Sequence, residues 1–172
     1  MAPGTGMEHA GRVVVGVSGS LASLAALRVA AKEARRGRRV LVAVIAWEPP
    51  EGEALYLRRP DPRWARHWEA EARARLNRAF DEVFGGAPPG VAVERRVIRD
   101  SPARALSALA AHPDDLLVLG TRPGRRRPSR VHRRARARTA CPVLTVPSPR
   151  PPKGLRRALR GMRAADFALV GE

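Results

Sequence analysis

The sequence has almost no cysteine: Cys141 is the single one among 172 residues. One thiol cannot form an intrachain disulfide, and it leaves no cysteine cluster for a structural metal. Long apolar runs are also missing, since no stretch reaches the roughly 18 residues that a membrane span requires. The first twelve residues contain no apolar segment of the kind found in secretory signals. These absences predict a cytoplasmic protein without a membrane span.

Acidic residues are scarce in the last third of the chain. Residues 1–119 contain 18 basic and 14 acidic residues, a net charge of +4. Residues 120–172 contain 15 basic and 2 acidic residues, a net charge of +13. A local excess of this size attracts anions, and phosphate groups are the obvious class.

Patterns typical of catalytic and metal sites are lacking as well. The four histidines show no metal-ligand spacing, so we expect them at the surface. Asp114 and Asp115 directly precede an apolar run, which favours a turn over a pair of catalytic carboxylates. Cys141 opens another apolar run and is expected to be buried and inert. We therefore predict no metal site, no catalytic residues and no enzymatic activity.

The spacing of apolar residues along the chain alternates between two types of periodicity. Short apolar runs predict strands at residues 12–17, 40–47, 91–98, 116–119 and 142–146. Helical spacing predicts helices at 21–36, 62–84, 101–110 and 131–139, with a loop at 48–60. In the second of these helices we expect Trp64 and Trp68 to pack in the core. Strands separated by helices predict an α/β fold with a doubly wound, five-stranded parallel sheet.

The chain divides into three parts by composition. Residues 1–11 are expected to be a flexible N-terminus, and residues 12–147 a single domain. Residues 148–172 begin with a proline-rich linker and continue as a basic tail. Apolar residues at helical spacing in this tail (Leu155, Leu159 and Met162) make a short helix a candidate there.

Several segments resemble the universal stress protein family, and they occur in the family's order. They are 13–20 with 24–27, 43–50, 101–106, 115–122 and 141–147. The resemblance implies a Rossmann-like sheet with strand order 3-2-1-4-5 and helices on both faces. It also implies a homodimer through the last strand and, in many members, ATP between the first and fourth strands. We accordingly expect a dimeric, non-enzymatic stress-response protein with weak or lost ATP binding.

The expected nucleotide loop departs from the family's G-x2-G-x9-G-(S/T) pattern. Gly120 matches the first glycine, but Pro123 occupies the second position and Gly124 follows one place late. Ser129-Arg130 falls on the final pair, so about four residues are missing. Proline offers no amide donor where the glycine would let the backbone approach a phosphate.

The first two strands also differ from ATP-binding members. Ser18 stands where those members have an acidic residue, and Ala46 takes the position that would line the adenine. Arginines after Gly120 could hold phosphates in place of the glycines, or the loop could simply be solvated. The candidate nucleotide-binding residues are Val17, Ser18, Ala46, Gly120, Arg122, Gly124, Ser129, Arg130 and Val131.

An alternative function rests on the arginines between Arg122 and Arg138. This stretch holds nine arginines in 17 residues and no aromatic residue. Such a surface suits contact with phosphates of a polyanion, either a nucleic acid or a phosphorylated partner, without stacking on bases. The other interpretation is a solvated face of the helix at 131–139.

Overall fold

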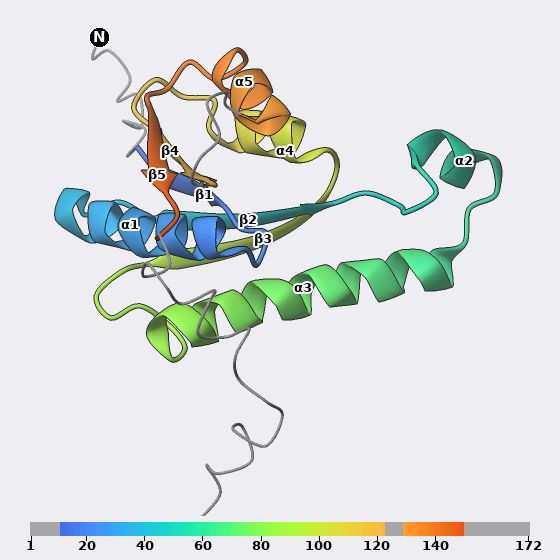
Figure 1. The fold of residues 1–172 in the computed structure, drawn as a ribbon, viewed down its shortest axis with the longest axis horizontal. Coiled ribbons are helices and arrows are strands. Elements are labelled where there is room, and N and C mark those ends of the chain that lie inside the picture. Colours follow the sequence, from blue (N-terminus) through green and yellow to red (C-terminus); the bar gives the residue numbers. More distant parts are fainter. Residues whose placement is uncertain (1–10, 123–128, 150–172) are drawn as a thin grey trace, which may run out of the picture.

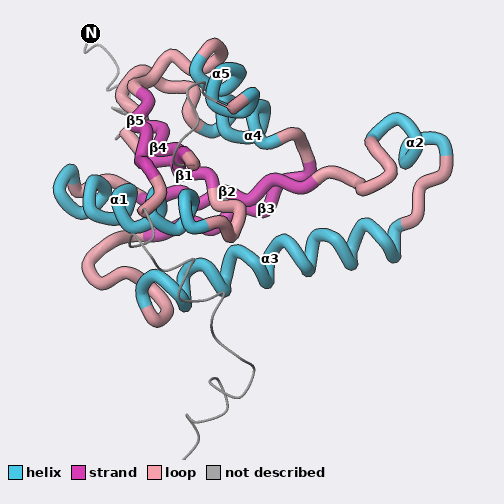
Figure 2. The backbone as a smooth tube through the Cα atoms, in the orientation of Figure 1, coloured by secondary structure: helices cyan, strands magenta, loops and turns pink. Residues whose placement is uncertain are grey.

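The computed structural model describes residues 11–122 and 129–149. In this part of the chain, five parallel strands form one sheet in the order β3-β2-β1-β4-β5 (Figures 1 and 2). The strands are β1 (Val13–Gly16), β2 (Leu41–Trp47), β3 (Val93–Arg99), β4 (Leu116–Thr121) and β5 (Val143–Pro147). The helices are α1 (Leu21–Gly37), α2 (Glu53–Arg58), α3 (Pro62–Phe84), α4 (Pro102–Leu109) and α5 (Arg130–Arg136). The predicted fold class and strand order are confirmed.

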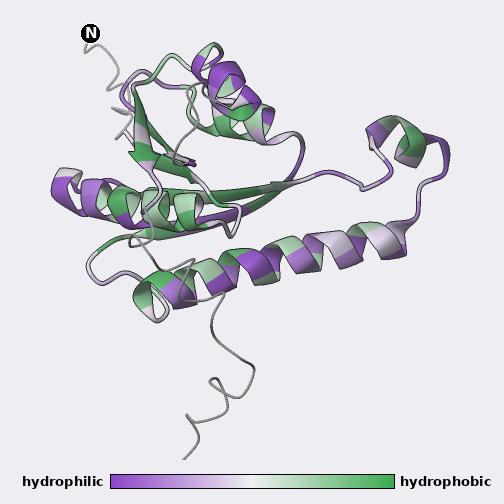
Figure 3. Cartoon of the chain, in the orientation of Figure 1, coloured by the Kyte–Doolittle hydropathy of each residue, from purple (hydrophilic) through white to green (hydrophobic). Residues whose placement is uncertain are grey.

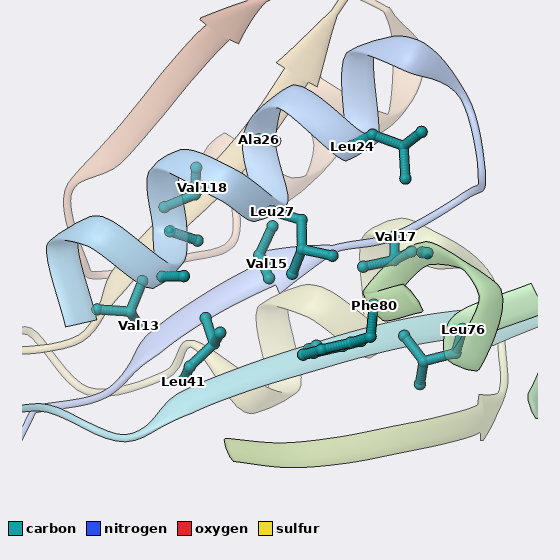
Figure 4. Packing of buried hydrophobic residues seen from close by; sticks show 14 of the residues in the cluster. Val13, Val15, Val17, Leu24, Ala26, Leu27, Leu41, Leu76, Phe80 and Val118 are labelled. Carbon is teal, nitrogen blue, oxygen red and sulfur yellow. The ribbon is translucent and has the colours of Figure 1, made fainter. Parts of the chain in front are cut away.

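Both faces of the sheet are buried. Strand β1 lies in the centre, where Val14 pairs with Val42 of β2 and with Leu117 of β4. Val13 and Val15 belong to the apolar cluster under α1 and α3, together with Leu27 and Phe80 (Figure 4). Val14 belongs to the cluster on the other face, under α4 and α5. Because the inner strands β1, β2 and β4 are covered on both faces, their sequences are apolar nearly throughout. The edge strands β3 and β5 are less apolar and carry exposed positions.

Figure 3 shows this layering as hydropathy: much of the sheet is green, whereas α3 and α5 carry much purple. None of the helices in the described ranges is long and apolar enough to cross a membrane. Residues 1–10 and 150–172 lie outside the described residues. The flexible N-terminus, the short tail helix and the cytoplasmic location therefore stay predictions.

One prediction was wrong at residues 48–60, where we expected a loop. Residues 53–58 form α2, and Tyr56 is buried. The guanidinium carbon of Arg99, at the end of β3, lies 4.1 Å from the Tyr56 ring centroid. The same arginine forms a 2.8 Å ion pair with Glu53. These contacts reach α2 from a strand more than 40 residues away, so local periodicity could not reveal them.

The prediction that Trp64 and Trp68 pack in the core was also wrong. The side chain of Trp64 is 56% exposed, and its ring stacks on that of Trp68 at 6.4 Å. With 23 residues, α3 is about 35 Å long, whereas a seven-residue strand spans about 23 Å. The N-terminal part of α3 therefore extends past the sheet (Figure 1), and only its later apolar residues reach the core.

Candidate functional site

A cavity of about 660 Å³ lies at the carboxyl ends of β1, β2 and β4. This is the point where the chain leaves β1 and β4 toward opposite faces of the sheet, as α1 and α5. Such switch points are the usual ligand sites of open α/β sheets. The cavity is lined by Gly16, Val17, Ser18, Ser20, Ala22, Ser23, Val44, Ile45, Ala46, Arg75, Pro102, Leu106, Leu119, Gly120, Thr121, Arg122, Ser129, Val131 and His132.

The cavity brings together most of the residues that the sequence nominated. Those that line it are Val17, Ser18, Ala46, Gly120, Arg122, Ser129 and Val131. Arg130 is exposed on α5 and is not among the lining residues. Gly124 lies outside the described residues. That these residues bind a nucleotide stays a prediction.

The turn between β1 and α1 presents hydroxyl groups to the cavity. Its central residue, Gly19, has φ of +78°, a conformation that favours glycine. Ser20 caps α1 by accepting a hydrogen bond from the Ser23 amide, and its hydroxyl lies 3.0 Å from that of Ser18. The Ser18 amide in turn donates to the Ser23 hydroxyl at 3.2 Å. Reciprocal bonds of this kind hold the turn in one conformation.

Gly120 has a packing role that the sequence did not indicate. A Cβ placed on Gly120 would lie 2.1 Å from the Ala22 carbonyl oxygen and 2.9 Å from the Ser23 amide nitrogen. The end of β4 therefore touches the backbone of the first turn of α1. Only glycine permits this approach, and all three residues line the cavity.

His132 was expected at the surface, but the structure places it in the wall of the cavity. Its Nδ1 lies 2.9 Å from the Ser129 hydroxyl, which also accepts a hydrogen bond from the His132 amide. Desolvation lowers the pKa of His132, and a hydrogen bond with the Leu119 backbone opposes this shift. The lowered pKa favours the neutral form of the imidazole, which adds polarity to the cavity wall. Its involvement follows from the N-terminal turn of α5, where residues 129 and 132 are neighbours.

Arg75 is another lining residue that the sequence did not indicate. It lies on α3, directly before the buried Leu76. Helical spacing predicted that Leu76 is in the core. It could not show that Arg75, the residue before it, lines the cavity at the ends of β1 and β4. The structure sets Arg75 against the β1–α1 turn, and Arg122, after β4, lines the same cavity.

The lining of the cavity has an apolar part and a polar part. Apolar side chains from β2, α4 and β4 form one part, and serine hydroxyls with two arginines form another. Among the described residues, none of those lining the cavity is a carboxylate, and no group of side chains could hold a metal ion. Cys141 is buried, and burial raises the pKa of its thiol, so it is a poor nucleophile at neutral pH.

Together, the sheet order and the cavity define a doubly wound α/β protein with a cavity at its switch point. The sequence model of the universal stress protein family matches residues 9–147, and the chain belongs to that family. No curated protein sequence gave a significant match.

Solved structures include similar folds. One is a universal stress protein in complex with cAMP, at 26% identity and a TM-score of 0.52, covering 81% of this chain and 98% of the other. Universal stress protein UspA from Lactobacillus plantarum aligns at 22% identity and a TM-score of 0.56, over 79% and 97%. The hypothetical protein MJ0577 aligns at 12% identity and a TM-score of 0.58, over 82% and 98%. The last two support the fold alone.

Proposed function

We propose that this universal stress protein is a non-enzymatic stress-response protein that binds an adenine nucleotide in the cavity, with ATP held weakly. The observation that carries the proposal is the cavity itself, which joins an apolar wall to hydroxyls and two arginines at the switch point. An apolar wall suits a base, and hydroxyls with arginines suit a phosphate. The similar protein solved with cAMP supports the choice of adenine.

Weak ATP binding follows from the charges around the cavity. Magnesium that accompanies a triphosphate is usually held by one or two carboxylates. The cavity offers none, and the sequence contains no Asp or Glu between residues 116 and 165. Pro123, in place of the second loop glycine, also removes an amide donor. A nucleotide with fewer negative charges therefore suits the cavity better than ATP.

Thermal unfolding with added nucleotides tests the proposal. cAMP or AMP at 100 times its Kd should stabilise the protein by about 2.7 kcal/mol. For a chain of this length, that is a rise in Tm of roughly 5–10 °C. MgATP at the same concentration should give a smaller rise, and guanosine monophosphate serves as the control for the base. If no adenine nucleotide at millimolar concentration shifts Tm, the protein does not have this function.

A homodimer through the last strand is part of the proposal. Strand β5 is an edge of the sheet, and its Leu144 side chain is 36% exposed. An unpaired edge strand with an exposed apolar residue is suited to pairing with a second copy. Light scattering that gave the 18.7 kDa mass of one chain at micromolar concentration would contradict the dimer.

A second candidate function, contact with a polyanion, is favoured by the exposure of the arginines on and beside α5. The exposed residues are Arg122, Arg130, Arg133, Arg134, Arg136 and Arg138. Both α5 and the residues that follow it present guanidinium groups to solvent, which is what contact with a phosphate backbone requires.

The salt dependence of duplex DNA binding tests this second candidate. Each phosphate contact contributes about 0.9 to the slope of log affinity against log salt. Replacing Arg134 and Arg138 by alanine should therefore lower the slope by about 2. The matched control removes Arg63 and Arg66 from α3, where the slope should not change. Equal slopes in the two double variants, or no binding at about 50 mM salt, would reject the surface as a polyanion site.

A further inference from the structure

Arg75 lines the cavity from α3, far in sequence from the expected nucleotide loop that follows β4. Its neighbours Ala72, Leu76 and Ala79 pack into the core and fix this part of α3 against the sheet. Its Cγ and Cδ atoms lie along the β1–α1 turn, since a Cβ placed on Gly19 would be 3.3 Å and 3.4 Å from them. The stem of the arginine is thus held beside Gly19, the residue between Ser18 and Ser20, and both serines also line the cavity.

The positive charge of Arg75 has no carboxylate partner within the described residues. Other arginines there do form ion pairs with carboxylates. Arg73, on the same helix, lies 2.8 Å from Glu69. Arg122, at the end of β4, lines the same cavity and likewise has no carboxylate partner in the described ranges. Two unpaired guanidinium groups from different elements therefore border one cavity without a carboxylate.

We propose that Arg75 and Arg122 together bind the single phosphate of a nucleoside monophosphate or cyclic monophosphate, without a divalent cation. This inference rests on the proposed function, since it assigns the phosphate end of the same ligand. Two guanidinium groups supply two positive charges, which match a terminal monophosphate of about −2, more than neutralise a cyclic phosphodiester and fall short of a triphosphate. Arginine also donates parallel hydrogen bonds to phosphate oxygens, so no metal is needed to neutralise them.

The experiment separates binding of the phosphate from binding of the nucleoside. Calorimetric titrations of the full chain measure Kd for adenosine, AMP, cAMP and ATP, each with Mg²⁺ and with EDTA. The variants are Arg75→Ala, Arg75→Lys and Arg122→Ala. Arg78→Ala is the matched control, because Arg78 is exposed on the same helix and does not line the cavity.

We expect AMP and cAMP to bind the unchanged protein more tightly than adenosine, with the same Kd in Mg²⁺ and in EDTA. Arg75→Ala and Arg122→Ala should each weaken AMP binding about tenfold and leave adenosine binding unchanged. The Kd of Arg75→Lys for AMP should lie between those of the unchanged protein and Arg75→Ala, because lysine keeps the charge and loses the paired hydrogen bonds. Arg78→Ala should bind both ligands as the unchanged protein does.

Three outcomes would overturn the inference, and they differ in what else they overturn. If no adenine compound binds the unchanged protein, the proposed function fails together with the two-arginine site. If AMP binds but EDTA abolishes its binding, the function stands and the phosphate is held through a metal. If AMP binds equally to the Arg75→Ala and Arg78→Ala variants, the phosphate lies elsewhere in the cavity.

Discussion

Replacing Gly120 by alanine should lower the free energy of unfolding by about 3 kcal/mol, at the upper end of what overpacking costs. The added methyl group would overlap the Ala22 carbonyl, which belongs to the backbone of α1 and cannot rotate away. Either β4 or the first turn of α1 must move. In urea unfolding this loss appears as a lower midpoint, and in thermal unfolding as a Tm lower by roughly 6–12 °C.

Gly37→Ala is the matched control for this prediction. A Cβ on Gly37 would lie 2.7 Å from Nε of Arg39, at the far end of a flexible side chain that can move. We expect the stability of this variant to change by no more than about 0.5 kcal/mol. If both glycine variants unfold at the same denaturant concentration, the contact between β4 and α1 is not a tight one.

Gly120→Ala should also affect the ligand, since Gly120, Ala22 and Ser23 all line the cavity. A displaced α1 turn would carry the Ser20 and Ser23 hydroxyls with it. Gly120, which resembles the first glycine of a phosphate-binding loop, thus helps to shape the cavity by its packing against α1. This role does not depend on a contact between its amide and a phosphate.

The sheet could be predicted from the sequence because its signal is local. Runs such as Val13-Val14-Val15 and Leu116-Leu117-Val118 are apolar on both faces, and such runs indicate buried parallel strands. The strand order was implied by the family resemblance and is confirmed. The order also placed the cavity, because the ends of the first and fourth strands then lie side by side.

The remaining parts of the site depend on contacts between distant segments. Arg75 enters the cavity because α3 packs across the sheet beside the β1–α1 turn, more than 50 residues away in sequence. Trp64 followed the same helical spacing as Leu76, yet it is exposed near the start of α3, the end of the helix that extends past the sheet (Figure 1). Periodicity identifies the face of a helix that can be buried, but only the length of the sheet decides how much of that face is covered.

The family fold and the charge pattern of this chain point to different aspects of the same site. The fold places a cavity at the switch point, as it does in other doubly wound sheets. No carboxylate occurs among the described residues that line the cavity. Under the proposed function, this lining favours a ligand that binds without a magnesium ion.

Asp115→Ala should lower the free energy of unfolding by about 3 kcal/mol, for a reason unrelated to the cavity. The carboxylate is fully buried in the turn before β4. It accepts hydrogen bonds from the Arg12 amide at 2.8 Å and the His112 amide at 3.3 Å. The Arg12 guanidinium adds an ion pair at 3.4 Å and donates to the Leu109 carbonyl at 2.7 Å. Asp115 thereby joins the start of β1 to the start of β4.

Removing this carboxylate leaves two backbone amides without their acceptor, and a buried donor without a partner is costly. The Arg12 side chain is 30% exposed and can turn to water, which keeps the loss near the lower end for a buried ion pair. Asp115→Asn should cost less, since an amide oxygen can still accept from one of the two amides. Urea unfolding of both variants measures the difference.

Asp114→Ala provides the matched control, because Asp114 is adjacent and its side chain is 68% exposed. We expect it to change stability by no more than about 0.5 kcal/mol. Asp115 lies at the opposite end of the strands from the cavity, so the folded fraction of Asp115→Ala should bind AMP with unchanged Kd. Loss of AMP binding in that variant below its unfolding transition would show that the two ends of the sheet are coupled. We expect Asp115→Ala to lose stability and keep its affinity for AMP. Gly120→Ala should lose both stability and affinity for AMP.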